Sequence, residues 1–376
     1  MRERLAAVDG LRGLAILMVT AFHLWRMVGR PLVQPLGIDI TPLLPAGADG
    51  FFLFLTLSGF CLYLPHALGR PAPAAWGFYR RRLWRIVPPY YLTLAVWLPL
   101  WATAPDNPGR WAGWWWHLLT HATFTHTLTA GTFGSVCGIL WFVGPLVHLY
   151  LTFPLLARAM RRPVLVGAGT AAWLVALALM VPHLGDSPVA WRNLLTLGPY
   201  FLLGILAAHL YSRHAARLRP LAGMLTVYGL AQVLVVPLLA EAYLWTPALV
   251  LSRALGWAAL TLGLALESQL ARVLVPPPLP WLGPIAYSLY LANYLPLRVP
   301  AWFGALAGSP AWWALAVGSL VAGSLATYYL AERPSRRPLK QRGRDLEEIH
   351  RRPTPALTRP QAAVDAGGSA SLNHHH

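Results

Sequence analysis

Long apolar segments recur along the chain, separated by short polar stretches. Windows of about 20 mostly apolar residues, enough for a helix to cross the ~30 Å hydrocarbon core of a bilayer, can be placed at about ten positions. The pattern therefore predicts an all-α, polytopic integral membrane protein with about ten transmembrane helices. The windows centre on residues 11–29, 48–68, 87–104, 138–157, 163–182, 193–211, 221–239, 244–265, 280–298 and 311–330.

The composition supports a membrane protein. Of the 376 residues, 56% are hydrophobic and only 11% are charged, too few charges to cover the surface of a soluble domain of this length. The formal net charge of +17 comes from basic residues in short clusters between the apolar runs. Membrane topology explains that distribution better than nucleic-acid binding does, and no nucleic-acid partner is expected.

The distribution of arginine and lysine predicts the orientation of the chain. With the N-terminus in the cytoplasm, most basic clusters fall on the cytoplasmic side. We therefore expect both termini to be cytoplasmic and the helix count to be even. The basic residues left on the outside are Arg30, Arg110, Arg192 and Arg298.

Short loops predict one transmembrane domain over residues 1–333. Residues 334–373 are basic and then rich in Pro, Ala and Gly, as expected for a cytoplasmic tail that is disordered or bound to the membrane surface. Residues 374–376 look like the remnant of an expression tag. The longest outside stretch, 105–137, contains four tryptophans near its start, which predicts a helix lying in the membrane interface.

The first window carries two ionisable residues. Eleven helical steps of about 100° take Arg12 to His23 and end about 20° from three full turns, so both side chains lie on one face, about 16 Å apart along the axis. Ionisable groups inside a membrane are unfavourable unless they face the bundle interior or water, which makes both residues functional candidates. The alternative is structural: His23 as a hydrogen bonder between helices and Arg12 as a snorkelling anchor.

Six short motifs occur in a fixed order along the chain. Together they resemble acyltransferase family 3, a family of integral membrane O-acyltransferases. They are Asp9-Gly10-Leu11-Arg12-Gly13 with Phe22-His23; Phe51-Phe52 with Leu57-Ser58-Gly59-Phe60; Phe78 to Pro88, which includes Arg81, Arg82 and Arg85; Leu140-Trp141 with Tyr150-Leu151 and Pro154-Leu155-Leu156; Ala286 to Leu291; and Glu332-Arg333-Pro334.

This resemblance implies transfer of an acyl group from a cytoplasmic acyl-CoA, with acetyl-CoA the expected donor, to a hydroxyl of a glycan, glycolipid, lipid or terpenoid. It also implies a multi-pass protein of a bacterial-type inner membrane that modifies the cell envelope. His23 is the expected general base and Arg12 its catalytic partner, which orients the donor or stabilises developing charge. Arg81, Arg82 and Arg85 are expected to hold the phosphates of coenzyme A. Candidate acceptor contacts are Ser58, Trp141, His148, Tyr287, Ser288 and Asn293.

Two polar positions depart from the family pattern. Leu146 stands where many members have a glutamate, and Asn293 stands where many have a histidine. A less polar acceptor pocket would suit a lipid or terpenoid alcohol, or an acceptor that bears one sugar on an apolar body. His148 is the nearest polar residue that could replace the missing glutamate.

Two other functions remain open from the sequence. The buried Arg and His would also serve the substrate or proton path of a transporter or flippase, and a relative that only binds acyl-CoA would carry the same motifs.

Two further observations carry no assigned role. Arg253 lies in an apolar run and needs a partner, which Glu241 or an anionic substrate could supply. His117 and His121 have metal-ligand spacing and His126 follows, but no Cys or Glu is nearby, so no metal is expected.

Overall fold

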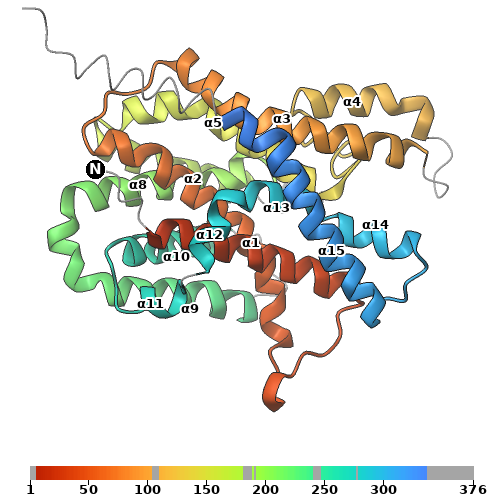
Figure 1. Ribbon diagram of the computed structural model, residues 1–376. Coiled ribbons are helices and arrows are strands. Elements are labelled where there is room, and N and C mark those ends of the chain that lie inside the picture. Colours follow the sequence, from red (N-terminus) through yellow and green to blue (C-terminus); the bar gives the residue numbers. More distant parts are fainter. Residues whose placement is uncertain are drawn as a thin grey trace, which may run out of the picture. The chain divides into compact units, whose positions relative to one another are not determined.

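The computed structural model describes residues 6–103, 110–180, 189, 192–239, 247–276 and 278–336. Over these residues the protein is helical, with no β-strand (Figure 1). The predicted all-α class is therefore confirmed. The predicted tail, 334–373, lies outside the described residues except for its first three positions, so the domain boundary at residue 333 stays a prediction.

Apart from residues 28–40 and 123–137, the described helices follow one another with short connections, as the sequence pattern predicts (Figure 1). The longer ones are α1 (Ala6–Met27), α2 (Gly50–Ala67), α3 (Ala75–Ala102), α4 (Trp114–Ala122), α5 (Val143–Ala159), α6 (Pro163–Met180), α8 (Leu194–Leu218), α9 (Ala222–Leu239), α10 (Pro247–Ala265), α14 (Leu295–Trp302) and α15 (Pro310–Thr327). The shorter ones are α11 (Ala271–Leu274), α12 (Leu279–Leu282), α13 (Ala286–Ala292), the 3₁₀ turns η2 (Thr41–Asp49), η6 (Arg219–Leu221) and η7 (Gly283–Ile285), and the π turn η8 (Tyr328–Glu332).

Seven helical stretches among the described residues are long and apolar enough to cross a membrane. The windows at 193–211 and 221–239 fall in one of them, Leu194–Val235, because α8 and α9 are joined by the single turn η6. The window at 280–298 is no single helix. It is divided among α12, η7, α13 and α14, where Pro284 and Pro296 each remove a backbone donor. The count of about ten spans and the orientation of the termini remain predictions.

The outside stretch contains the short helix that its tryptophans predicted. Helix α4 begins at Trp114, and its Trp115 and Trp116 side chains are exposed. Exposed indole rings on a short amphipathic helix fit a location at the membrane interface.

Glycines bring the helix backbones into direct contact where the bundle is tightest. A Cβ at Gly59 of α2 would lie 2.1 Å from the Phe201 carbonyl oxygen, and one at Gly204 of α8 would lie 2.1 Å from the Thr56 carbonyl oxygen. Small residues serve this purpose between membrane helices, where lipid leaves little hydrophobic drive for association. The α2–α8 pair therefore forms a rigid centre against which α1, α5, α6 and α10 pack.

The start of α1 is held in the same way. A Cβ at Gly13 would lie 2.2 Å from the Leu279 carbonyl oxygen of α12, and Gly10 is close to Val275. The glycines that flank Arg12 in its motif thus let α1 pack closely against α12, which fixes the position of Arg12.

Replacing Gly204 with alanine tests the α2–α8 contact. We expect Gly204→Ala to lower the free energy of unfolding by about 1–3 kcal/mol, because the new methyl group would overlap the Thr56 carbonyl. Thermal unfolding of the purified protein in detergent measures the effect. The matched control is Gly318→Ala on α15, where a Cβ would meet open space and alanine is the better helix former. Equal melting temperatures for the two variants would contradict the close contact.

Candidate functional site

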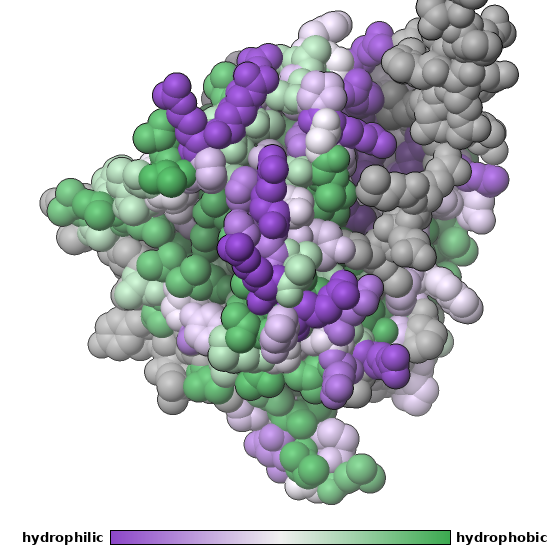
Figure 2. Space-filling model, turned by 90° about the vertical axis from the view of Figure 1, so that its left-hand side faces the viewer, coloured by the Kyte–Doolittle hydropathy of each residue, from purple (hydrophilic) through white to green (hydrophobic). Residues whose placement is uncertain are grey.

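Three arginines from two helices gather where α1 begins. Arg12 of α1 lies near enough to Arg82 and Arg85 of α3 for their like charges to repel one another, and all three lie near Tyr150 of α5. Figure 2 shows the side of the molecule where α1 begins, and hydrophilic side chains are numerous on this face. We call Arg12, Arg82 and Arg85 the arginine cluster. The structure thus brings together one predicted catalytic residue and two of the three predicted donor contacts, while Arg81 is exposed.

The start of α3 is held in place by contacts on two sides. The Tyr79 hydroxyl donates a hydrogen bond of 2.8 Å to the Leu151 carbonyl, and Phe78 stacks on Phe153 with ring centroids 4.9 Å apart. From the other side, the Tyr287 hydroxyl donates to the Ile86 carbonyl at 3.1 Å. The arginines of α3 therefore stand on a fixed helix.

The arginines of the cluster differ in how their charge is balanced. Arg12 forms an ion pair of 2.9 Å with Asp9, one turn earlier on α1. Arg82 lies over the Phe78 ring at 5.7 Å. Within the described part of the chain, no carboxylate forms an ion pair with Arg82 or Arg85. These two half-buried guanidinium groups therefore have no counter-ion among the described residues. Unpaired arginines on neighbouring turns are typical of a site that binds an anion.

The last helix adds a second charged group that the sequence analysis did not assign. Glu332 is fully buried, forms an ion pair with Arg336 and accepts a hydrogen bond from the Ser288 hydroxyl. Arg336 also donates to the Pro284 carbonyl at 2.8 Å and interacts electrostatically with Arg85. Glu332 belongs to the last of the six motifs. The sequence feature that could have identified it is an acidic residue at the end of an apolar helix.

Tyr287 and Ser288 are placed beside the arginine cluster, but both side chains already have protein partners. Tyr287 donates to α3 and Ser288 to Glu332. The observed contacts assign them to holding α13 against its neighbours. Their predicted contact with the acceptor remains a prediction.

His23 lies at the opposite end of α1 from Arg12. Because α1 is unbroken from Ala6 to Met27, the two residues are separated by about 16 Å of helical rise. The half-buried His23 ring packs edge-to-face on Phe22, with centroids 5.5 Å apart. Its imidazole interacts electrostatically with Arg26.

Aromatic and basic side chains gather at the same end of α1 as His23. Arg192 interacts electrostatically with Arg26 and lies over the Trp141 ring at 5.1 Å. Trp141 in turn packs edge-to-face on Phe51, with centroids 5.0 Å apart. The predicted acceptor contact Trp141 is therefore in the neighbourhood of His23. Arg192, which the sequence analysis treated only as a topology marker, joins it.

The remaining predicted acceptor contacts are dispersed. Ser58 accepts a hydrogen bond of 3.4 Å from Tyr150, on the side of the arginine cluster. Asn293 is 1% exposed and donates to the Leu289 carbonyl at 3.1 Å, while its Oδ1 has no hydrogen-bond partner among the described residues. His148 lies close enough to His126 for the two imidazole rings to interact electrostatically.

His148 of α5 lies near a group of histidines on α4 and the segment that follows α4. His121 and His126 stack with centroids 4.0 Å apart, and both His117 and His121 lie within hydrogen-bonding distance of the Ser135 hydroxyl. Burial lowers the pKa of His126 to about 4 and that of His121 to about 2, so both rings are neutral at pH 7 and act through hydrogen bonds and stacking. Within the described residues, no group of His, Cys, Asp and Glu side chains is arranged to hold a metal ion.

A buried ion pair holds the half of α1 that carries His23. Arg253 of α10 and Asp49, at the start of α2, lie 2.8 Å apart with side chains 5% and 6% exposed. The neighbouring Gly47 and Gly50 pack directly on α1, where added Cβ atoms would lie 2.7 Å from the Met18 carbonyl oxygen and 2.4 Å from the Ala15 carbonyl oxygen. The partner of Arg253 is therefore Asp49. Glu241, the partner considered from the sequence, lies outside the described residues.

The fold and the site define a polytopic helical membrane protein with a cluster of arginines at one end of its first helix and a histidine at the other. A family model described as an acyltransferase domain matches residues 5–329. The chain belongs to acyltransferase family 3, as its motifs predicted, and this membership indicates a membrane acyltransferase. No curated protein and no solved structure matched the chain.

Breaking the buried pair should destabilise the protein more than replacing it. We expect Arg253→Met to lower the free energy of unfolding by about 3–5 kcal/mol, because it leaves the Asp49 carboxylate without its counter-ion. The double variant with Asp49→Leu should recover much of that loss, since no buried charge is then unpaired. A thermal-unfolding cycle in detergent checks this, and losses in the double variant equal to the sum of the single losses would contradict it.

Proposed function

We propose that this protein is an O-acyltransferase that moves an acyl group from a cytoplasmic acyl-CoA to a hydroxyl of a glycan, glycolipid, lipid or terpenoid. Acetyl-CoA is the proposed donor, and His23 is the proposed general base. The observation that carries the proposal is the presence of two half-buried arginines, Arg82 and Arg85, without carboxylate partners in the described residues, beside Arg12.

The arginine cluster suits the phosphate end of coenzyme A. Phosphates accept paired hydrogen bonds from the planar guanidinium group, and an arginine keeps its charge at any physiological pH. Arg82 and Arg85 would supply these contacts from one fixed helix, with Arg12 completing the cluster from α1. Arg81, which is exposed, would guide the approaching donor.

The separation between the cluster and His23 matches the shape of the donor. Coenzyme A carries its thioester at the end of an extended pantetheine arm, far from its phosphates. A donor held by its phosphates at the arginine cluster would reach along α1 toward His23, about 16 Å away. The same separation distinguishes the two roles considered for Arg12: the residue is too far from His23 to stabilise charge on the reacting atoms, so its proposed role is to orient the donor.

Acyl transfer at His23 follows from the chemistry of imidazole. The acceptor hydroxyl attacks the thioester carbonyl carbon while His23 takes the hydroxyl proton. The carbon–sulfur bond of the tetrahedral intermediate then breaks, and the coenzyme A thiolate leaves and takes the proton held by the His23 imidazolium. Arg26 and Arg192 are two cationic groups on the His23 side of α1, where they would favour the developing oxyanion.

The surroundings of Trp141 favour an acceptor with an apolar face. The indole of Trp141 lies between Phe51 and the Arg192 guanidinium, and Leu146 stands where many family members have a glutamate. A sugar ring on an apolar body, or a lipid or terpenoid alcohol, would pack on such a surface.

No observation favours the transporter or flippase that the sequence left open. The family match is to an acyltransferase domain over most of the chain, and the proposed site accounts for the arginines and the histidine that had suggested a transport path.

Replacing His23 tests the chemical step. We expect His23→Ala to lower transfer by roughly 10²–10⁴-fold, the usual contribution of general base catalysis, with an unchanged KM for the donor. The assay measures free thiol released from acetyl-CoA by purified protein in nanodiscs with a panel of acceptors. The control is His66→Ala at the end of α2. A fully active His23→Ala variant would reject the proposed base.

Replacing Arg82 tests the donor site separately. Arg82→Gln should raise the KM for acetyl-CoA by about tenfold while kcat changes little, because it removes a charge-assisted contact made equally in the ground and transition states. The control is Arg80→Gln, at an exposed position on the same helix. An unchanged KM in Arg82→Gln, or an equal increase in the control, would contradict phosphate binding at the cluster.

A further inference from the structure

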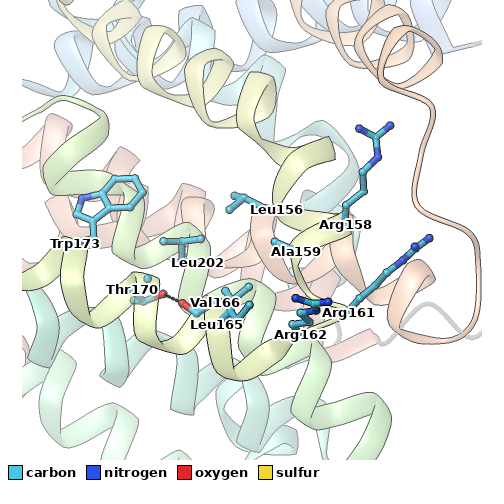
Figure 3. A pocket seen from close by; sticks show the side chains of 11 residues that line it. Leu156, Arg158, Ala159, Arg161, Arg162, Leu165, Val166, Thr170, Trp173 and Leu202 are labelled. Carbon is cyan, nitrogen blue, oxygen red and sulfur yellow. Dashed lines mark hydrogen bonds between the residues drawn. The ribbon is translucent and has the colours of Figure 1, made fainter.

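A groove lies between α5, α6 and α8, in a part of the protein that the proposed reaction does not use. It measures about 440 Å³, within the range of roughly 300–1,000 Å³ typical of small-molecule sites. Figure 3 shows three arginines at one end of the groove and Trp173 at the other. It is lined by Leu156, Arg158, Ala159, Arg161, Arg162, Leu165, Val166, Gly169, Thr170, Trp173 and Leu202.

The wall of the groove presents apolar surface. Its two polar side chains are already engaged, since the Thr170 hydroxyl donates to the Val166 carbonyl and the Trp173 indole donates to the Leu195 carbonyl, each at 2.8 Å. A Cβ at Gly169 would meet no atom within 4 Å, so this glycine leaves the middle of the groove open. Such a wall suits a hydrocarbon chain and offers little to a polar ligand.

The mouth of the groove is strongly cationic. Arg158, Arg161 and Arg162 are all exposed and lie at the turn between α5 and α6. Among the described residues, no carboxylate forms an ion pair with any of them. The start of α6 lies at the same point and adds the positive end of an 18-residue helix, which favours a phosphate there.

The groove lies where a membrane lipid would meet it. The turn with the three arginines separates two candidate spans, Gly138–Ala159 and Pro163–Met180, so the mouth is at a membrane surface and the wall extends into the hydrocarbon region. The α6 span is only 17% buried within the protein. Most of this helix therefore depends on surrounding lipid for its packing.

We propose that this groove is a binding site for an anionic glycerophospholipid. The phosphate group lies among Arg158, Arg161 and Arg162, and one acyl chain lies along α6 past Gly169 toward Trp173. A positive-inside signal alone explains three arginines at a cytoplasmic turn, but it does not require an open apolar groove that begins at them. Charge at the mouth and hydrocarbon at the wall together match one molecule, a lipid with an anionic headgroup.

Lipid retention by the full-length protein tests the site. The protein is purified from nanodiscs that contain equal amounts of phosphatidylglycerol and phosphatidylcholine, and the bound lipids are counted by native mass spectrometry. We expect the wild type to retain phosphatidylglycerol preferentially. The variant R158Q/R161Q/R162Q should retain it about tenfold less, because each lost cation weakens attraction to the anionic headgroup.

Two matched controls separate this site from general surface charge. R213Q/R217Q/R219Q removes the same charge from the end of α8 and the following turn, and should leave retention unchanged. Gly169→Leu fills the groove with the arginines intact and should reduce retention, whereas Gly167→Leu, at an equally open position on α6 outside the groove lining, should not. If R158Q/R161Q/R162Q aggregates, Arg162→Gln replaces it.

Three results would overturn the proposal. They are an absence of preference for phosphatidylglycerol in the wild type, equal losses in the two triple variants, and wild-type retention in Gly169→Leu.

Discussion

The arrangement of this protein depends on how each arginine among its apolar helices is neutralised. A guanidinium in or beside a membrane is costly unless a carboxylate, water or an anionic ligand meets it. Three arginines of the described chain have carboxylates: Arg12 pairs with Asp9, Arg253 with Asp49, and Arg336 with Glu332. Each pair also fixes a structural element. They stabilise the start of α1, the junction of α2 with α10, and the end of the last helix.

Arg82 and Arg85 have no carboxylate partner among the described residues, so their charge is not balanced within this part of the protein. Arg82 and Arg85 stand beside Arg12 on a helix fixed by contacts with α5 and α13. Positive charge concentrated on a rigid element is what an anionic donor requires. The end of α1 that carries His23 is fixed independently, by the glycine contacts around Asp49. One unbroken helix thus sets the distance between the proposed donor-binding end and the proposed reacting end, and neither end has to move for the other to be in place.

The sequence predicted the helical class, the family and the placement of Arg12 and His23 on one helix, because these depend on local periodicity and on ordered motifs. It did not identify the partner of Arg253, since Asp49 is about 200 residues away in sequence and only tertiary packing brings the two together. The role of Glu332 was missed although its ion pair with Arg336 is local in sequence, and that of Arg192 was missed because its contact with Trp141 depends on tertiary packing. The prediction of one helix over residues 280–298 was wrong, because hydropathy alone does not detect the helix breaks near Pro284 and Pro296. The reason for Gly13 became evident only from the backbone of the facing helix.

A density map of the protein with a non-hydrolysable acetyl-CoA analogue tests the account most directly. We predict that the phosphates lie within about 3 Å of the Arg82 and Arg85 guanidinium nitrogens. The carbonyl carbon of the analogue should lie toward the far end of α1, leaving room for an acceptor hydroxyl in hydrogen-bond reach of the His23 imidazole. Phosphates bound away from the arginine cluster, or a carbonyl group that remains near Arg12, would contradict the account.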